Sequence, residues 1–505
     1  MTDIPVNSHR ISIGDSIVSM LLEKAREQER QALEKKEERL RPVFHFSNPT
    51  GWMNDPNGFS EYKGEHHLFY QYYPYATHWD SMHWGHAKSS DFIRWEYLPA
   101  ALAPDEEYDS FGVFSGSALT EGEKQILMYT GVRELILENG EKKIFQNQCI
   151  AVGDGTDYVK CENNPVITSS LLPEGSSRED FRDPKLWKED DRYFVVAGSR
   201  HKDGSGQIAL FYSDDLEQWK LGSILDRSEN KLGKMWECPD FFPLGDKQVL
   251  LISPQEMEAD GLEFHGGNNT AFLTGTYEKQ TMKFTREQVQ CVDYGLDFYA
   301  PQTMLSDDGR RVMIGWMQSW DNPMYPPEQA WSGMMTVPRE LIWKDGYVYQ
   351  KPVRELEKYR RNAVNYPVVY VEKETALPGV SGRSTELLIK FTGKEYTKCR
   401  MKMAAENGYY SELVYDREDG ILTFDRSHSG IRRDCICTRS LKLREKDKDL
   451  SLRILIDRYS IEIFVNEGEQ VMTSLVYTPV SAEGITFSSN GRLCMDITKY
   501  DIEVE

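Results

Sequence analysis

The sequence predicts an all-β protein, in which a five-bladed β-propeller is followed by a C-terminal β-sandwich and preceded by an N-terminal helical extension. Three observations lead to this prediction. After residue 42, short runs of strand-forming residues alternate with turn residues. This pattern recurs five times, with a period of about sixty residues. After residue 347 the period is lost, but strand-like alternation continues.

Five marker residues define the repeat. They are Asp55, Ser115, Asp183, Glu237 and Tyr299, with spacings of 60, 68, 54 and 62 residues. A unit of a few short strands cannot bury its own faces, so neighbouring units must stack, and five units arranged radially form a propeller. Each marker lies about eight residues before a turn. We therefore expect all five at the same end of an innermost strand, beside the central channel.

The N-terminal segment has the composition of a helix. From Asp15 or Ser16, either of which can cap a helix, to Leu40 it is rich in Leu, Glu, Lys, Arg and Ala, and Pro42 ends the pattern. Its second half is charged nearly all round, which favours a solvated surface helix over one that joins two subunits.

The C-terminal part shows the alternation of a half-buried hairpin on either side of the turn 457–460. The apolar positions are Leu452, Ile454, Ile456, Ile461, Ile463 and Val465. A short linking helix is predicted before this part. The predicted organisation is a helical extension (1–41), a propeller (42–347), a linker helix (348–361) and a sandwich (362–505).

Composition excludes some classes of partner. The chain has 60 Lys and Arg against 81 Asp and Glu, a net charge of -21, which repels nucleic acid and anionic membrane surfaces. No segment has the length of a signal peptide core or a membrane span, so we expect a cytoplasmic protein. The eight cysteines show no Cys-x-x-Cys spacing, so we expect them to be reduced, and neither a metal nor an organic cofactor is expected.

The repeat geometry predicts one pocket. Residues about eight positions after each turn return to the marker end, among them Gln71, Thr130 and Trp316. Asp55, Asp183 and Glu237 should therefore converge there, and like charges held together raise one another's proton affinity. Considered alone, Asp183 would be interpreted as the ion-pair partner of Arg182. Glu237 alone would be interpreted as a buried acid that caps a loop. Three carboxylates at equivalent positions favour a catalytic role instead.

That role fits cleavage of a glycosidic bond, which needs one ionised carboxylate and one protonated acid. Trp52, Trp79 and Trp316 would offer apolar faces to a sugar, and Asn54 and Gln71 would offer amides to its hydroxyl groups. A small-molecule sugar is thus the expected partner, and a homo-oligomer is compatible with the sequence.

Seven motifs resemble, in order and spacing, those of glycoside hydrolase family 32, which includes invertases, sucrose-6-phosphate hydrolases, inulinases and levanases. They are Trp-Met-Asn-Asp-Pro-Asn-Gly (52–58), Phe-Ser-Gly-Ser-Ala (114–118), Phe-Arg-Asp-Pro (181–184), Trp-Glu-Cys-Pro-Asp (236–240), Tyr-Ala-Pro-Gln-Thr (299–303), Gly-Trp-Met-Gln-Ser-Trp (315–320) and Val-Pro-Arg-Glu-Leu (337–341). The resemblance covers roughly residues 42–505. The N-terminal helix lies outside it.

The resemblance implies a retaining β-fructofuranosidase. It assigns Asp55 as the nucleophile, Glu237 as the acid and base, and Asp183 as the transition-state stabiliser. The positions that it assigns to the substrate pocket are Asn54, Gln71, Trp79, Phe114, Ser115, Arg182 and Trp316.

Several alternatives stay open at this stage. Within enzymes, they are an exo-acting fructan hydrolase, a fructosyltransferase and a five-bladed arabinan-type hydrolase, although residues 52–58 argue against the last. Outside enzymes, they are a carbohydrate-binding propeller without turnover and a sandwich that binds sugar on its own.

Overall fold

The computed structural model describes residues 18–35, 40–137, 139–321, 329–430, 435–445 and 449–504. Within these residues the chain is almost entirely β-structure, with one α-helix, α1 (Met20–Glu34), and a few short 3-10 turns. The described helix is too short and too polar to cross a membrane. All eight cysteines lie in the described part and are free, as the sequence predicts.

The strands before residue 353 form five antiparallel sheets that follow one another along the chain. The first contains β1 (Gly51–Tyr62), β2 (Glu65–Tyr73), β3 (His83–Ser89) and β4 (Glu96–Leu102); the second contains β5 (Gly112–Glu121), β6 (Lys124–Ile136), β7 (Lys142–Gly153) and β8 (Tyr158–Lys160); the third contains β9 (Ser176–Glu189), β10 (Arg192–His201), β11 (Gly206–Ser213) and β12 (Lys220–Arg227). The fourth contains β13 (Met235–Leu244), β14 (Lys247–Gln255), β15 (Ala271–Glu278) and β16 (Lys283–Cys291); the fifth contains β17 (Tyr299–Leu305), β18 (Arg311–Trp316), β20 (Arg339–Lys344) and β21 (Tyr347–Pro352).

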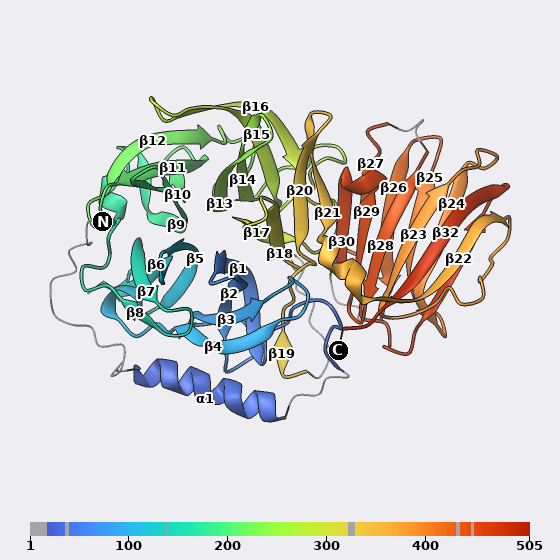
Figure 1. Cartoon of the computed structure of the whole chain (residues 1–505). Helices are drawn as coiled ribbons and strands as arrows, with labels where there is room; N and C mark the ends of the chain where they lie inside the picture. The colour runs from blue at the N-terminus through green and yellow to red at the C-terminus, as the bar shows by residue number, and fades with distance from the viewer. Residues whose placement is uncertain are drawn as a thin grey trace.

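The five sheets are arranged in a ring (Figure 1). Each first strand contacts the first strands of its neighbours, in the order β1, β5, β9, β13, β17, and β17 returns to β1. Between β18 and β20 the chain leaves the fifth sheet and forms a short strand, β19 (Trp331–Ser332). This strand pairs in parallel with β1. The last sheet is thereby joined to the first by backbone hydrogen bonds.

The C-terminal part consists of two further sheets. The six-stranded sheet contains β22 (Arg360–Val371), β32 (Leu493–Ile502), β23 (Thr385–Phe391), β28 (Ser451–Asp457), β29 (Ser460–Val465) and β30 (Gln470–Leu475), in this order; the five-stranded sheet contains β27 (Thr438–Lys442), β26 (Ile421–His428), β25 (Tyr409–Asp416), β24 (Lys398–Glu406) and β31 (Gly484–Ser489). Apolar side chains from both sheets share one core. The predicted hairpin is confirmed, since Ile454 pairs with Ile463 and Ile456 with Ile461.

Buried charges join the ring to this C-terminal part. Arg339 of β20 reaches Asp293 at 3.0 Å and Glu462 of β29 at 2.5 Å. His45 lies between Asp457 and Glu462, at 2.8 Å from each. Burial disfavours the charged imidazole, but the two carboxylates outweigh it and raise the pKa of His45 to about 9. His45 is therefore a cation at neutral pH.

The helix predictions need two corrections. α1 begins at Met20 after the N-cap Ser19 and ends at Glu34, so it is shorter than expected, and the predicted caps at 15 and 16 lie outside the described residues. The linker helix predicted over 348–361 is only a 3-10 helix, Arg354–Tyr359, because β21 and β22 take up the residues on either side of it.

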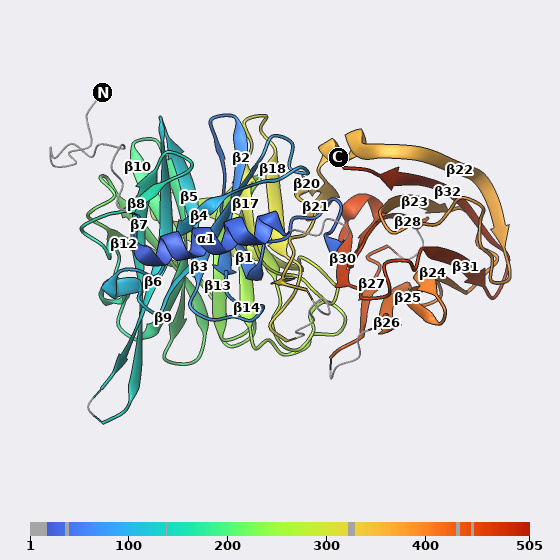
Figure 2. The same ribbon diagram turned by 90° about the horizontal axis from the view of Figure 1, so that it is seen from below.

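The charged surface of α1 is also not uniformly solvated. The helix lies along β4, the outer strand of the first sheet (Figure 2). Arg26 and Glu29 are buried against that strand, where they bind the backbone oxygen and nitrogen of Ala100 at 3.0 and 2.9 Å. Glu29, which lies in the half expected to be solvated, and Arg26 thus occupy the polar groups of an edge strand.

Candidate active site

The first strand of each sheet in the ring is bulged at its marker residue. Asp55, Ser115 and Asp183 lie inside breaks in strand register, and breaks in β13 and β17 begin at Glu237 and Tyr299. An extra residue bends a strand and re-aims its side chains. The repeated bulge turns the marker side chains towards one another, since Ser115 contacts Asp55 and Tyr299 contacts Glu237.

The second strand of each sheet brings further residues to the level of the markers, as the repeat spacing predicts. Thr130 pairs with Phe114, Ser253 with Glu237, and Trp316 with Tyr299. Gln71 is the β2 residue that faces the bulge of β1. Its amide nitrogen donates to the backbone oxygen of Val113 at 2.9 Å, and the side chain is 2% exposed.

Asp55 is held by hydrogen bonds to both carboxylate oxygens. The Ser115 hydroxyl donates to Oδ2 at 2.7 Å, and the Asn54 amide donates to Oδ1 at 3.0 Å. Asn54 is oriented in turn by the indole N–H of Trp52, which donates to its oxygen at 2.8 Å. These contacts fix the direction in which the carboxylate points.

Asp183 lies beside Asp55, with Cys238 between them. The backbone N–H of Cys238 donates to Oδ2 of Asp183 at 3.0 Å, and its sulfur lies 3.6 Å from that oxygen and 3.5 Å from Oδ2 of Asp55. The backbone N–H of Asp183 donates to Thr130 Oγ1 at 2.9 Å. Both Asp183 (φ 64°) and Cys238 (φ 46°) are in the left-handed region, a strained conformation that tends to occur at functional sites.

Glu237 accepts hydrogen bonds from three side chains. Arg182 approaches Oε1 through Nε at 3.0 Å and through Nη2 at 2.9 Å. Oε2 accepts from the amide of Gln255 at 2.8 Å and from the hydroxyl of Tyr299 at 2.7 Å. The predicted Arg182 contact is therefore made with Glu237, and the nearest carboxylate in sequence, Asp183, is bound by Cys238 instead.

The carboxylates affect one another's protonation. Burial raises the pKa of Asp55, the charge of Glu237 adds to this, and the hydrogen bond from Ser115 opposes it. Burial also raises the pKa of Asp183, to about 7; the positive charge of Arg182 opposes this rise, and the charges of Glu237 and Asp55 add to it. Carboxyl groups that hold a proton near neutral pH are suited to acid and base chemistry.

Aromatic rings adjoin this cluster. Trp52 and Trp316 are buried and meet edge to face with centroids 6.0 Å apart. Trp79, which is 37% exposed, meets Phe114 at 5.8 Å. Trp52, Phe114 and Trp316 share one apolar cluster with Tyr299.

The structure thus brings the predicted residues to one end of the ring and adds three that the sequence reasoning left without a role. Tyr299 was a repeat marker, and Cys238 directly follows Glu237, so both carried a positional signal. Gln255 directly follows the return expected at Ser253 to Pro254, but nothing in the pattern distinguished it. Within the described ranges no three His, Cys, Asp or Glu side chains are placed to hold a metal ion.

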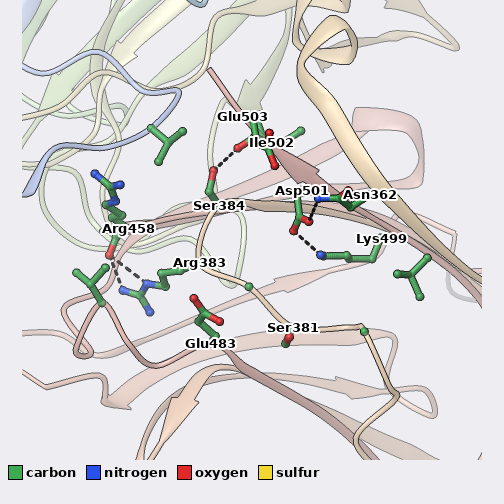
Figure 3. A pocket seen from close by; sticks show the side chains of 15 residues that line it. Asn362, Ser381, Arg383, Ser384, Arg458, Glu483, Lys499, Asp501, Ile502 and Glu503 are labelled. Atoms are coloured by element: carbon green, nitrogen blue, oxygen red, sulfur yellow. Dashed lines mark hydrogen bonds and ion pairs between the residues drawn. The ribbon is translucent and has the colours of Figure 1, made fainter. Parts of the chain in front are cut away.

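A separate hollow of about 640 Å³ lies in the C-terminal part, near the start of β22 and the end of β32 (Figure 3). Arg383 donates there to the backbone oxygen of Arg458, and Lys499 is paired with Asp501. None of its fifteen lining residues is aromatic, so it lacks the flat apolar surface on which a sugar ring stacks. It does not favour the alternative of an independent sugar site in this part.

Comparison with known proteins identifies the family of the chain. The chain matches the model of the glycosyl hydrolases family 32 N-terminal domain over residues 45–352 and that of the family 32 C-terminal domain over 355–503. A sucrose-6-phosphate hydrolase from Escherichia coli is 36% identical over 451 residues, which is 89% of this chain and 92% of that protein. A raffinose invertase from Escherichia coli is 36% identical over 440 residues, or 86% and 89% of the two chains.

Solved structures show the same relationship. A family 32 β-fructofuranosidase from Bombyx mori has a TM-score of 0.83 and 34% identity, and the match covers 95% of this chain and 98% of that one. A sucrose-6-phosphate hydrolase from Lactobacillus gasseri has a TM-score of 0.81 and 28% identity, with coverage of 95% and 96%. On this evidence the chain belongs to glycosyl hydrolase family 32.

Proposed function

We propose that this protein is a retaining β-fructofuranosidase that hydrolyses sucrose or sucrose 6-phosphate, with short fructooligosaccharides as further substrates. The observation that carries the proposal is the hydrogen-bonded cluster of Asp55, Asp183 and Glu237, delivered by the bulged first strands of three sheets. Family membership supports hydrolysis of glycosidic bonds, and the similar sucrose-6-phosphate hydrolases and invertase support the substrate class.

In the first step of the proposed reaction, Asp55 attacks the anomeric carbon of the fructosyl unit. The bond from this carbon to the glycosidic oxygen breaks, and Glu237 gives its proton to the departing oxygen. In the second step, Glu237 takes a proton from water, the water oxygen bonds to the same carbon, and Asp55 leaves as a carboxylate. The products are fructose and the leaving sugar.

Arg182 takes part in the proposed reaction by holding Glu237. Both oxygens of Glu237 accept hydrogen bonds, and Oε1 is held by Arg182. A turn of the guanidinium towards a fructose hydroxyl would free Oε1 and leave the acid ready to donate. Asp183 would bind the ring hydroxyls on the other side and stabilise the positive charge that develops in the transition state.

We further propose that the ring is a five-bladed β-propeller over residues 42–347 and that residues 362–505 form a β-sandwich. The closed order of first strands and the pairing of β19 with β1 support the propeller. The core shared by the two C-terminal sheets supports the sandwich. The cytoplasmic location and a homo-oligomer stay predictions, which cell fractionation and light scattering of the purified protein would test.

The experiment is fructose release from sucrose and from sucrose 6-phosphate by purified protein, beside Asp55→Asn. The matched control is Asp214→Asn, a change at a 64% exposed side chain that pairs with Arg192. We expect release by the wild type and the control and none by Asp55→Asn. The ratio of kcat/KM for the two sugars then identifies the preferred substrate. Wild-type rates in Asp55→Asn would refute the proposal.

A further inference from the structure

The guanidinium of Arg182 has a second set of partners besides Glu237. It approaches Glu237 through Nε at 3.0 Å and through Nη2 at 2.9 Å. Its third nitrogen, Nη1, contacts the side-chain oxygen of Gln146 at 3.2 Å and Oδ1 of Asp180 at 3.5 Å. Neither Gln146 nor Asp180 has a role in the reaction described above. One cation is therefore shared between the proposed acid and a second pair of acceptors.

Both acceptors are themselves held in place by hydrogen bonds. Gln146 of β7 is 7% exposed, and its side-chain oxygen also accepts from the backbone N–H of Phe181 at 3.0 Å. The other carboxylate oxygen of Asp180 accepts from the hydroxyl of Ser177 at 3.0 Å. Side chains fixed in this way lose little conformational freedom when they bind Arg182, so this pair of acceptors is preorganised.

The positive charge of Arg182 is maintained by the carboxylates around it. Burial disfavours the guanidinium cation. The charges of Glu237, Asp183 and Asp180 outweigh burial and raise the pKa of this side chain above its ordinary value. Arg182 therefore stays positive, and a carboxylate that attracts it on one side weakens its hold on the carboxylate on the other side.

We propose that Gln146 and Asp180 are positioning residues, which hold Arg182 through Nη1 and share its charge with the proposed acid. In the proposed reaction, the guanidinium turns from Glu237 towards a fructose hydroxyl. The contacts of Gln146 and Asp180 are made by a different nitrogen, so they can persist during this turn and act as its pivot. The inference rests on the proposed function, and it adds two residues that act on Glu237 through Arg182.

The dependence of the reaction on pH tests this assignment, because several charged groups meet at the acid. The titratable and charged groups that interact with Glu237 are Arg182, Asp183, Asp55, Cys238 and Tyr299, and Gln255 of β14 adds a neutral donor. Arg182 is the cation among them. Its charge also opposes the raised pKa of Asp183, so weakening or strengthening its hold acts in the same direction on both acids.

The measurement is kcat/KM for sucrose against pH, whose fall at high pH reports loss of the proton from the acid. Asp180→Asn removes a competing carboxylate. More of the charge of Arg182 then favours the ionised acid, so the fall should move to lower pH by about half a unit. Gln146→Glu keeps the length of the side chain and its acceptor oxygen but adds a competing carboxylate, so the fall should move to higher pH.

The matched control is Glu179→Gln, which removes the same charge from an exposed side chain one residue before Asp180 and should not move the fall. Asp180→Glu keeps the charge and should behave as the wild type. No shift in Asp180→Asn and Gln146→Glu, shifts of both in one direction, or an equal shift in Glu179→Gln would overturn this inference and leave the proposed function standing. Absence of fructose release by the wild type would overturn the proposed function and this inference with it.

Discussion

At the residue scale, the three carboxylates differ in what binds them. Asp55 is held by Ser115 and Asn54, Asp183 by the backbone of Cys238, and Glu237 by Arg182 and two neutral donors. An ionised nucleophile beside neutral donors remains reactive, and the hydrogen-bond partners of Asp55 in the described part of the chain are all neutral. The different partners thus suit the different roles proposed for the three acids.

Glu237→Gln should remove the proton donor while leaving the proposed nucleophile, Asp55, in place. The amide keeps the size of the side chain but cannot give a proton, so hydrolysis of sucrose should fall by about 100-fold or more. Fructosides whose leaving groups depart without protonation should retain part of their activity. The measurement is kcat on sucrose and on an aryl fructoside, and equal losses on both would contradict the acid role.

The raised pKa of Asp183 predicts how the free energy of unfolding depends on pH. Its pKa is about 7 in the folded protein against 3.8 for an unperturbed aspartate, so the unfolded chain loses this proton first as the pH rises. Stability should therefore fall between about pH 4 and pH 7 through this group. Asp183→Asn should be more stable relative to wild type at pH 8 than at pH 4.5, by about 1 kcal/mol or more. Urea denaturation at both pH values measures this, and a constant difference would contradict it.

At the scale of single elements, α1 offers a matched pair of arginines. The side chain of Arg26 is 10% exposed and contacts Asp157 at 2.8 Å and the backbone of β4, whereas that of Arg30 is 55% exposed and pairs with Glu23 and Glu27 on its own helix. Arg26→Ala should cost about 1–3 kcal/mol of unfolding free energy, because it removes the side chain that donates to the buried backbone oxygen of Ala100. Arg30→Ala should leave the free energy of unfolding nearly unchanged, because its ion pairs are exposed to solvent. Equal effects in denaturant titrations would show that α1 is not anchored through Arg26.

For the bulged first strands, the sequence predicts the level of the marker residues but not the bulges themselves. A repeat of five markers at the same distance from a turn predicts that their side chains lie at one level. The break in register at each marker, which turns Asp55 or Asp183 away from the regular alternation of a strand, has no equally simple signature. It follows from how five twisted sheets meet around one axis.

For the whole molecule, the joint between the ring and the C-terminal part depends on buried charges. The side chain of Arg339 is fully buried between Asp293 and Glu462, in contrast to Arg354, whose side chain is 64% exposed beside Glu340. Arg339→Met should cost about 3–5 kcal/mol, because it leaves the buried carboxylate of Asp293 without its cation and Glu462 with His45 alone. Arg354→Met should cost about 1 kcal/mol or less. Thermal unfolding of both variants tests this, and similar losses would contradict it.

The amino-acid sequence by itself determined the repeat, the order of the motifs and the identity of the three acids, because these depend on spacing along the chain and on residue chemistry. The length of α1, the extent of β21 and the burial of Arg26 and Glu29 were decided by tertiary contacts, which can take a charged residue out of water when a partner is present. The same holds for the partners of the acids. Arg182 is adjacent to Asp183 in the chain but binds Glu237, Gln255 reaches the site from β14, and Cys238 meets Asp183 only because β13 lies against β9. Periodicity places a residue at a level in the fold, but the direction of its side chain depends on packing between segments far apart in sequence.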